Sequence, residues 1–170
     1  RDMETAQIAV QAALTGHLVL STLHTNDAPS SLTRLVNIGL EPFLVGAAVN
    51  GVLAQRLVRR LCLHCKAQEK PGEEMASFLE MQGLDPELTW VSKGCEKCRQ
   101  TGFSGRVGIY ELLVVDDLLR DTIARNPNVS EFRRTCVERG MVTLRGDGMR
   151  KVKAGLTTVH EILRVTEANA

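Results

Sequence analysis

The sequence predicts an α/β fold with an inserted cysteine-rich module and a C-terminal bundle of helices. Three observations support this prediction. A helical pattern is followed directly by an unbroken apolar run, the paired cysteines all fall within residues 62–105, and helical patterns succeed one another from residue 117 onward. A helix that precedes a strand without polar alternation is typical of a sheet covered by helices on both faces.

The N-terminal part carries the α/β pattern. Apolar residues recur at helical spacing over residues 3–15, and Gly16 is suited to end that helix. Residues 17–23 then predict a strand, because the apolar run 18–20 shows no alternation and a strand covered on both faces needs none. We therefore expect a helix followed by a central, buried strand.

The following elements are predicted from their caps and their periodicity. Asn26 or Asp27 can cap a helix that Gly39 ends, and Pro42 suits the start of a second, shorter helix. Residues 49–61 fit both a helix and a strand, and the strand is favoured. A further strand is predicted at 106–115, and helices are expected at 75–81, 117–125, 130–139, 144–154 and 159–165.

Composition limits the classes of function. The chain has 170 residues, of which 21 are basic and 20 acidic, so its formal net charge of +1 provides no overall field to attract nucleic acid. No apolar run reaches the roughly 18–20 residues that cross a bilayer, and no signal peptide is visible. The first residue is Arg rather than Met, and we expect a fragment of a longer chain.

Four of the five cysteines form two CxxC pairs, namely Cys62 with Cys65 and Cys95 with Cys98. Two such turns complete a tetrahedral shell of four thiolates, which suits zinc and leaves no open position for a substrate. We therefore predict a structural zinc ion. Two redox pairs or unligated thiols are the alternative, and His64 could replace one ligand. The odd number of cysteines argues against a disulfide framework and for a reducing cytoplasm.

Zinc modules also occur in nucleic-acid-binding proteins and in hydrolases. Here acidic residues interleave with the lysines and arginines of residues 62–105, so the module presents no basic stripe. A zinc hydrolase would have to use His17, His24 or His160, but no set of carboxylates accompanies them. Both alternatives are therefore less favoured than a structural zinc ion.

The histidine segment 15–26 is the second informative stretch. His24 lies just past the end of the predicted central strand, where open α/β sheets bind their ligands. Neighbouring hydroxyl and amide side chains could donate hydrogen bonds to an anionic group there. A purely structural histidine is the alternative at both positions, and for His17 it is the favoured one.

Several separated motifs, taken together, resemble one family. Residues 1–6, the histidine segment, residues 53–57, the two CxxC pairs and residues 105–112 occur in the order seen in the secretion ATPases of type II secretion and type IV pilus assembly. The resemblance implies a hexameric, cytoplasmic ATPase with a RecA-like core that acts on an inner-membrane platform. The four cysteines are typical of the secretion and pilus-extension branch of that family.

The resemblance also implies roles for individual residues. His24 matches the residue placed near the γ-phosphate and is the expected catalytic residue. Nucleotide-binding roles fall on the end of the Walker B region, the histidine box and two basic positions of the core: Arg1, Asp2, Glu4, His17, Arg56 and Arg106. ATP and Mg²⁺ are the cofactors expected for the full-length protein, beside the structural zinc.

The resemblance implies three domains: part of the RecA-like core at 1–61, the zinc module at 62–105, and a last core strand with a helical subdomain at 106–170. The chain contains no GxxxxGK[ST] motif, so we expect it not to hydrolyse ATP alone. Expected partners are further copies in a hexamer and proteins of the inner-membrane platform. Neither nucleic acid nor direct membrane insertion is expected, and the protein should lie at the cytoplasmic side of the inner membrane.

Overall fold

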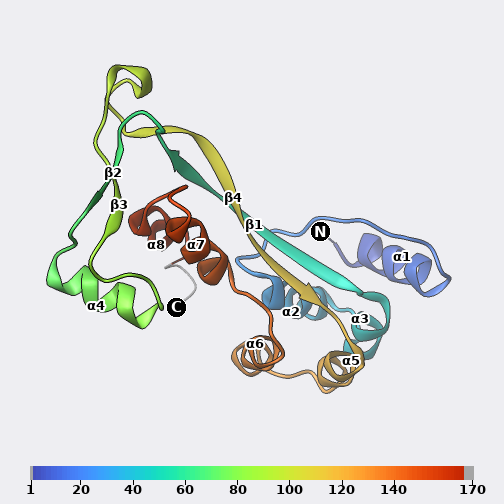
Figure 1. Cartoon of the computed structure of the whole chain (residues 1–170). Helices are drawn as coiled ribbons and strands as arrows, with labels where there is room; N and C mark the ends of the chain where they lie inside the picture. The colour runs from blue at the N-terminus through green and yellow to red at the C-terminus, as the bar shows by residue number, and fades with distance from the viewer. Residues whose placement is uncertain (1, 167–170) are drawn as a thin grey trace. The chain divides into compact units, whose positions relative to one another are not determined.

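The computed structural model describes residues 2–166, which form two compact units (Figure 1). The first unit comprises Arg1–Ala54 and Glu111–Thr143, and the second comprises Gln55–Tyr110 and Leu144–Ala170. Strand β1 (Gly51–Leu61) pairs with strand β4 (Phe103–Val114) in a two-stranded sheet. Both strands run through the two units, because the unit boundaries fall within them. The fold is mixed α/β, as predicted.

The first unit is mainly helical, and its helix starts follow from the sequence. Its helices are α1 (Met3–Leu14), α2 (Ala28–Ile38), α3 (Pro42–Ala48), α5 (Asp117–Ala124) and α6 (Val129–Glu138). The side chains of Asp2, Asp27, Asp116 and Asn128 each accept a hydrogen bond from a first-turn N–H group. The apolar faces of these helices pack with the end of β4 in one core, which includes Leu32, Val45, Leu113, Leu119 and Phe132.

The predicted strand at 17–23 is wrong for this chain. These residues have no regular structure and lead from α1 to α2 as an extended loop (Figure 1). Leu18 and Leu20 are 84% and 86% exposed, so the apolar run is not buried either. The reason is that a strand needs a hydrogen-bonded neighbour, and the strands of residues 2–166 pair only as β1 with β4 and β2 with β3.

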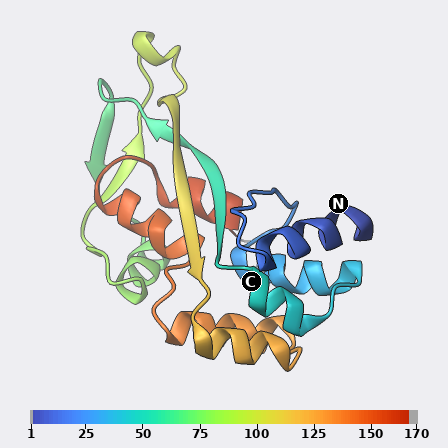
Figure 2. The same ribbon diagram turned by 90° about the vertical axis from the view of Figure 1, so that its right-hand side faces the viewer.

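The second unit contains a small antiparallel ribbon and two packed helices (Figure 2). Strand β2 (Lys66–Glu69) pairs with β3 (Thr89–Ser92), with Lys66 opposite Ser92 and Glu69 opposite Thr89. Helix α4 (Glu73–Met81) connects these strands, and the short helix η1 (Glu96–Cys98) follows them. Helices α7 (Leu144–Lys153) and α8 (Val159–Thr166) pack against each other.

The loop between α7 and α8 covers the end of β1. The N–H group of Leu61 donates to the carbonyl oxygen of Leu156 at 2.9 Å, and the hydroxyl of Thr157 donates to the carbonyl oxygen of Arg59 at 2.8 Å. These bonds satisfy backbone groups that an edge strand would otherwise expose. No helix among residues 2–166 has the length and apolar character that crossing a bilayer requires.

The other predicted elements are confirmed. The ambiguous stretch 49–61 is strand β1, and residues 106–115 fall largely within β4. Gly39 ends α2 with φ of 116°, and Pro42 begins α3. The predicted helices after residue 73 occur within two residues of their expected bounds. The division into domains at 62 and 106 stays a prediction.

Candidate functional site

The four paired cysteines converge on one point in the second unit. Their four Sγ atoms all lie within 4.8 Å of one another. Three of the separations are 3.9 Å between Cys62 and Cys95, 3.8 Å between Cys65 and Cys98, and 3.7 Å between Cys95 and Cys98. A metal at about 2.3 Å from each sulfur of a regular tetrahedron requires S···S edges of about 3.8 Å. The residues therefore fit a four-coordinate metal ion, and the thiols are free rather than bridged.

Two tight turns present these sulfurs. In the first, the N–H groups of Cys65 and Lys66 both donate to the carbonyl oxygen of Cys62, at 3.3 and 3.0 Å. In the second, Cys95 directly precedes the short helix η1, and Cys98 is the last residue of that helix. The N–H group of Cys62 donates to the carbonyl oxygen of Gly102 at 3.0 Å, so the two turns are fastened together by the backbone as well.

The backbone directly after Cys98 makes an unusual bend next to the four cysteines. Arg99 and Gln100 adopt φ of 52° and 62°, in the left-handed region that side chains other than glycine seldom occupy. This bend lets the N–H group of Gly102 donate to the Sγ atom of Cys98 at 3.2 Å, and the N–H group of Cys95 donates to the same atom at 3.2 Å. Such bonds orient the sulfur and stabilise its thiolate form.

The four thiols differ in acidity. Burial alone raises the pKa of the Cys98 thiol, but the N–H groups of Cys95 and Gly102 outweigh this effect and lower it to about 6. Burial and the neighbouring sulfurs raise the pKa of the Cys65 thiol to about 12. Adjacent sulfurs cannot all ionise without a compensating positive charge. A bound cation would supply that charge, since metal ligation requires the thiolate form.

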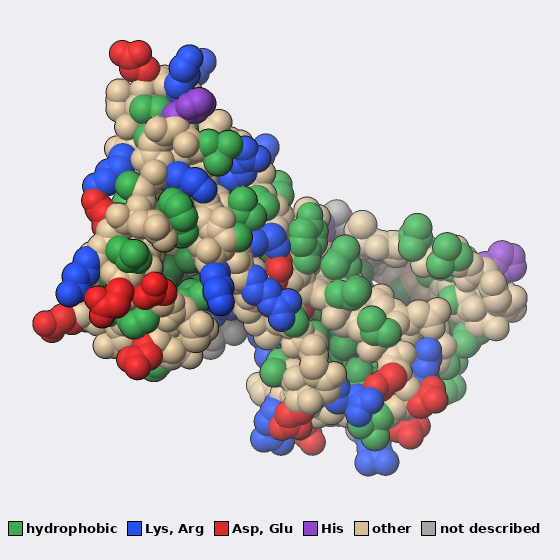
Figure 3. Space-filling model, in the orientation of Figure 1, with side chains coloured by type: hydrophobic (Ala, Val, Ile, Leu, Met, Phe, Trp, Pro, Cys, Tyr) green, Lys and Arg blue, Asp and Glu red, His purple; other side chains and the backbone are tan. Residues whose placement is uncertain are grey.

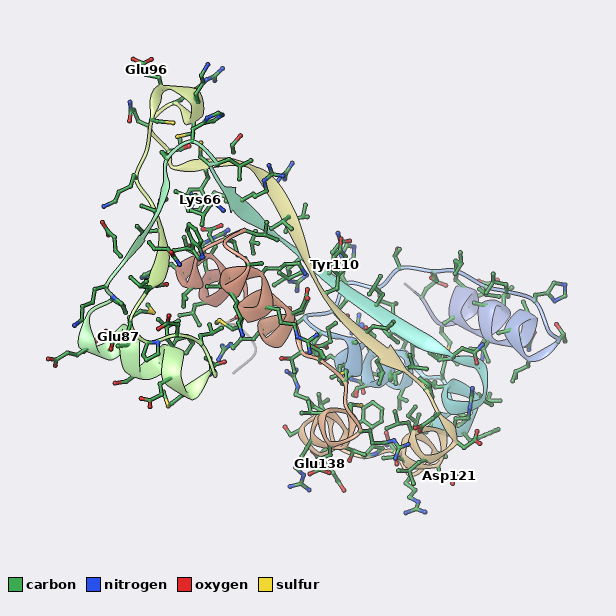
Figure 4. All side chains as sticks on the ribbon, viewed as in Figure 1. Lys66, Glu87, Glu96, Tyr110, Asp121 and Glu138 are labelled. Atoms are coloured by element: carbon green, nitrogen blue, oxygen red, sulfur yellow. The ribbon has the colours of Figure 1, made fainter. Side chains whose placement is uncertain are left out.

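The surface around the cluster is mixed in charge. Figure 4 shows Glu96 at the outer end of the module, beyond the sulfur atoms, and Figure 3 shows basic, acidic and histidine side chains together at that end. His64 is exposed, and the metal-ligand group found among residues 2–166 consists of the four cysteines alone. The surface is therefore charged without being predominantly basic.

The predicted nucleotide residues fall into two sets, one in each unit. Asp2 caps α1 by accepting the N–H group of Thr5 at 2.9 Å, Glu4 is exposed in the first turn of the same helix, and Arg1 lies outside the described residues. His17 places its Nδ1 atom 3.1 Å from the hydroxyl of Thr15.

The remaining predicted residues lie further along the chain. His24 is exposed on the extended segment of the first unit. Arg56 on β1 is half-buried and Arg106 on β4 is exposed, and both belong to the second unit. Their common role at a nucleotide stays a prediction.

Two buried carboxylates were not singled out by the sequence. Asp27 is 2% exposed and binds the guanidinium of Arg133 on α6. Glu111 is equally buried on β4, and it accepts the N–H group of Ala28 at 2.8 Å. Their partners lie 106 and 83 residues away, so the signal in the sequence was limited to the capping position of Asp27.

The second unit contains a comparable carboxylate at Glu161. Its two oxygens accept four hydrogen bonds, two from Arg59 and two from Arg164. Burial alone raises the pKa of this carboxyl group, but the arginines lower it to about 2. Glu161 borders a cavity of about 310 Å³ that is also lined by Trp90 and Phe103. All four acceptor positions of the carboxylate are occupied, so its role is to fasten α8 to β1.

Comparison with known proteins identifies the family. A family model described as type II/IV secretion system protein matches residues 1–164. The chain belongs to this family. It is 51% identical over 166 residues to the type II secretion system protein HxcR of Pseudomonas aeruginosa and 48% identical over 167 residues to the type IV pilus assembly ATPase TfpB of Acinetobacter baylyi. The resemblance drawn from the motifs is confirmed.

These relatives are much longer than the chain. The matches cover 98% and 97% of the chain but only 32% of HxcR and 28% of TfpB, so the chain spans about a third of the curated relatives it matches. A third relative, the type II secretion system ATPase E of Vibrio cholerae, is 45% identical and is covered to 33%. The nucleic-acid-binding alternative is not favoured by any of these similarities.

Solved structures confirm the fold class. The pilus retraction motor PilT, crystallised with bound ADP, aligns with a TM-score of 0.64 at 24% identity, over 97% of this chain and 37% of that one. The ATPase DotB of Legionella pneumophila aligns with a TM-score of 0.65 at 22% identity, over 100% of this chain and 37% of that one. The chain therefore has the fold of part of a RecA-like ATPase with a cysteine cluster that could hold a metal ion.

Proposed function

We propose that this chain forms the C-terminal part of a hexameric, cytoplasmic ATPase that powers type II protein secretion or type IV pilus assembly. The observation that carries the proposal is the similarity of nearly the whole chain, at about half identity, to proteins named for these two machines. In this proposal the ATPase acts at the cytoplasmic side of the inner membrane, on proteins of the membrane platform. ATP and Mg²⁺ bind the full-length protein, and this chain alone does not hydrolyse ATP.

In the proposed mechanism, His24 acts near the γ-phosphate. Its exposed position at the junction between the extended segment and α2 supports this role, because its side chain can reach a bound molecule. Positively charged side chains stabilise phosphate charge during transfer. We assign this task to Arg56 and Arg106. The capped start of α1, with Asp2 and Glu4, contributes the end of the Walker B region together with Arg1, and His17 belongs to the same histidine box.

We further propose that the four cysteines hold zinc in a structural role. A shell of four thiolates has no position left for water or substrate, so the ion supplies folding free energy rather than chemistry. The proposal fits the domain division predicted from the sequence, in which residues 62–105 form a module between the core segments 1–61 and 106–170. The exposed, charged end of the module is then available for contacts with a neighbouring copy or the platform.

The zinc proposal is tested by metal content. We expect the purified protein to contain one equivalent of zinc, and Cys62→Ser with Cys95→Ser to contain less than a tenth of that amount. Cys136→Ala is the matched control, because Cys136 is buried in α6 of the first unit and is not part of the ligand group found among residues 2–166. Full zinc content in the double variant would contradict the proposed ligands.

The catalytic proposal is tested in the full-length ATPase that contains this chain. We expect His24→Ala to lower kcat at least about 100-fold, the lower end of what a positioned acid or base contributes, with little change in the unfolding midpoint. His64→Ala, at another exposed histidine, is the control and should leave kcat unchanged. Equal losses of turnover and stability in His24→Ala would assign His24 a structural role instead.

A further inference from the structure

The N-terminal turn of α2 is held by two buried carboxylates. The N–H group of Ser30 donates to the Oδ1 atom of Asp27 at 2.8 Å, and the N–H group of Ala28 donates to the Oε1 atom of Glu111 at 2.8 Å. Both carboxylates are 2% exposed. Since these oxygens occupy N–H groups that a phosphate would need, the start of α2 is fixed by the protein itself.

Arg133 connects this turn to a distant helix. From α6 its guanidinium binds the Oδ2 atom of Asp27, which is 106 residues away in the sequence. The Asp27 side chain is 3% exposed, so its charge depends on this partner for stabilisation. Helices α2 and α6 also pack against each other. The ion pair therefore joins the first turn of α2 to α6, in addition to the packing between the two helices.

The backbone between His24 and this turn is held by hydrogen bonds. Thr25, the residue directly after His24, donates its hydroxyl to the carbonyl oxygen of Asp27 at 3.2 Å and lies 2.7 Å from the hydroxyl of Ser31. Its side chain is half-buried, whereas His24 is exposed. The residue next to His24 is thus bonded to both Asp27 and Ser31.

We propose that Arg133 is a positioning residue for His24, acting through Asp27 and Thr25. The inference rests on the proposed function, in which His24 acts near a phosphate. Displacing a catalytic group by about 1 Å can lower a rate by about 100-fold. The ion pair of Arg133 with Asp27 therefore affects turnover even where it affects folding little. It also makes the position of His24 depend on α6, an element that carries none of the predicted nucleotide residues.

The test uses two variants of the full-length ATPase. Arg133→Met leaves the Asp27 carboxylate buried without its partner, so we expect losses of both stability and turnover. Asp27→Asn combined with Arg133→Met removes the buried charge, and asparagine still caps α2. In this double variant we expect the unfolding midpoint to return towards that of the parent. We expect kcat to stay at least 10-fold below the parent, with the KM for ATP changed less than twofold.

Hydrogen exchange provides a second readout. The amides of residues 24–26 should exchange faster in the double variant than in the parent. Arg134→Met is the matched control, because Arg134 is the next residue on α6, is 74% exposed and pairs with Glu138 of its own helix. It should change neither kcat nor exchange.

The outcomes separate the inference from the proposed function. If His24→Ala retains full kcat, the proposed role of His24 is wrong, and the positioning role fails with it. If His24→Ala is impaired while the double variant recovers kcat together with stability, only the inference is overturned, and Arg133 is then a structural residue. A lowered kcat in both His24→Ala and the double variant, with faster amide exchange at residues 24–26 in the double variant, supports the positioning role of Arg133.

Discussion

Replacing Glu161 by glutamine probes the contact that fastens α8 to β1. The carboxylate is 3% exposed, and its hydrogen bonds to Arg59 measure 3.0 Å from the backbone N–H group and 2.7 Å from the guanidinium. The guanidinium of Arg164 donates to it at 3.1 and 2.9 Å. Glutamine keeps the size of the side chain but removes the charge and one of the two acceptor oxygens. Arg59 and Arg164 therefore lose about half of the hydrogen-bond acceptors that the carboxylate offers them.

The magnitude follows from the pKa of this carboxyl group. Burial raises it, but the arginines lower it from 4.5 to about 2. At about 1.4 kcal/mol per pH unit, this difference corresponds to roughly 3 kcal/mol. Arg59 and Arg164 are 53% and 57% exposed, so water screens part of the interaction and we expect about 2 kcal/mol. Because the pKa is lower in the folded state, this stabilisation is present above pH 4.5 and is lost as the pH falls to about 2.

The assay is urea unfolding followed by the fluorescence of Trp90, the only tryptophan, which lines the same cavity as Glu161. At pH 7 we expect Glu161→Gln to unfold with a free energy about 2 kcal/mol below that of the parent, and this gap should close between pH 5 and pH 2. Glu87→Gln is the control: Glu87 is 75% exposed and 4.0 Å from Lys70, so its effect should stay below about 0.5 kcal/mol. A gap that is absent at pH 7, or that does not vary with pH, would show that the charge of Glu161 does not stabilise the fold.

Two glycines of the second unit provide further predictions. A Cβ atom at Gly155 would lie 2.7 Å from the indole of Trp90, so Gly155→Ala should cost about 2–4 kcal/mol in urea unfolding. Gly83→Ala has the same φ of +66° but meets nothing within 4 Å, and should cost only about 1–2 kcal/mol; equal losses would show that Trp90 accommodates the methyl group. Gly148→Ala would place its Cβ 2.7 Å from Ile162, so we expect a lower melting temperature despite the better helix propensity of alanine, and an unchanged value would contradict this packing.

Much of the local structure could be predicted from the sequence. The capping side chains Asp2 and Asp27, the left-handed Gly39 and the first-turn Pro42 act within a few residues of where they stand, so their effects can be read without a fold. The cysteine cluster was predictable in part for a similar reason. The spacing within each CxxC turn already brings two sulfurs together, and only the meeting of the two turns required the tertiary structure.

The strand predicted at 17–23 shows where such reasoning fails. Its apolar run predicts burial, but burial depends on neighbouring strands, which residues 2–166 do not supply for it. An apolar run shows that a segment is able to form a buried strand. Whether the strand forms depends on the neighbouring strands that can pair with it.

The family, the four converging cysteines and most of the helices follow from the sequence, but the strand expected at 17–23 does not form and strands β2 and β3 were not expected. Only the tertiary structure decided which buried charges meet, as in the pairs of Asp27 with Arg133 and Glu161 with Arg59. The physical reason is the range of the interactions. Caps and metal-binding turns depend on neighbours along the chain, whereas these ion pairs join residues more than 100 positions apart and exist only once the helices and strands have packed.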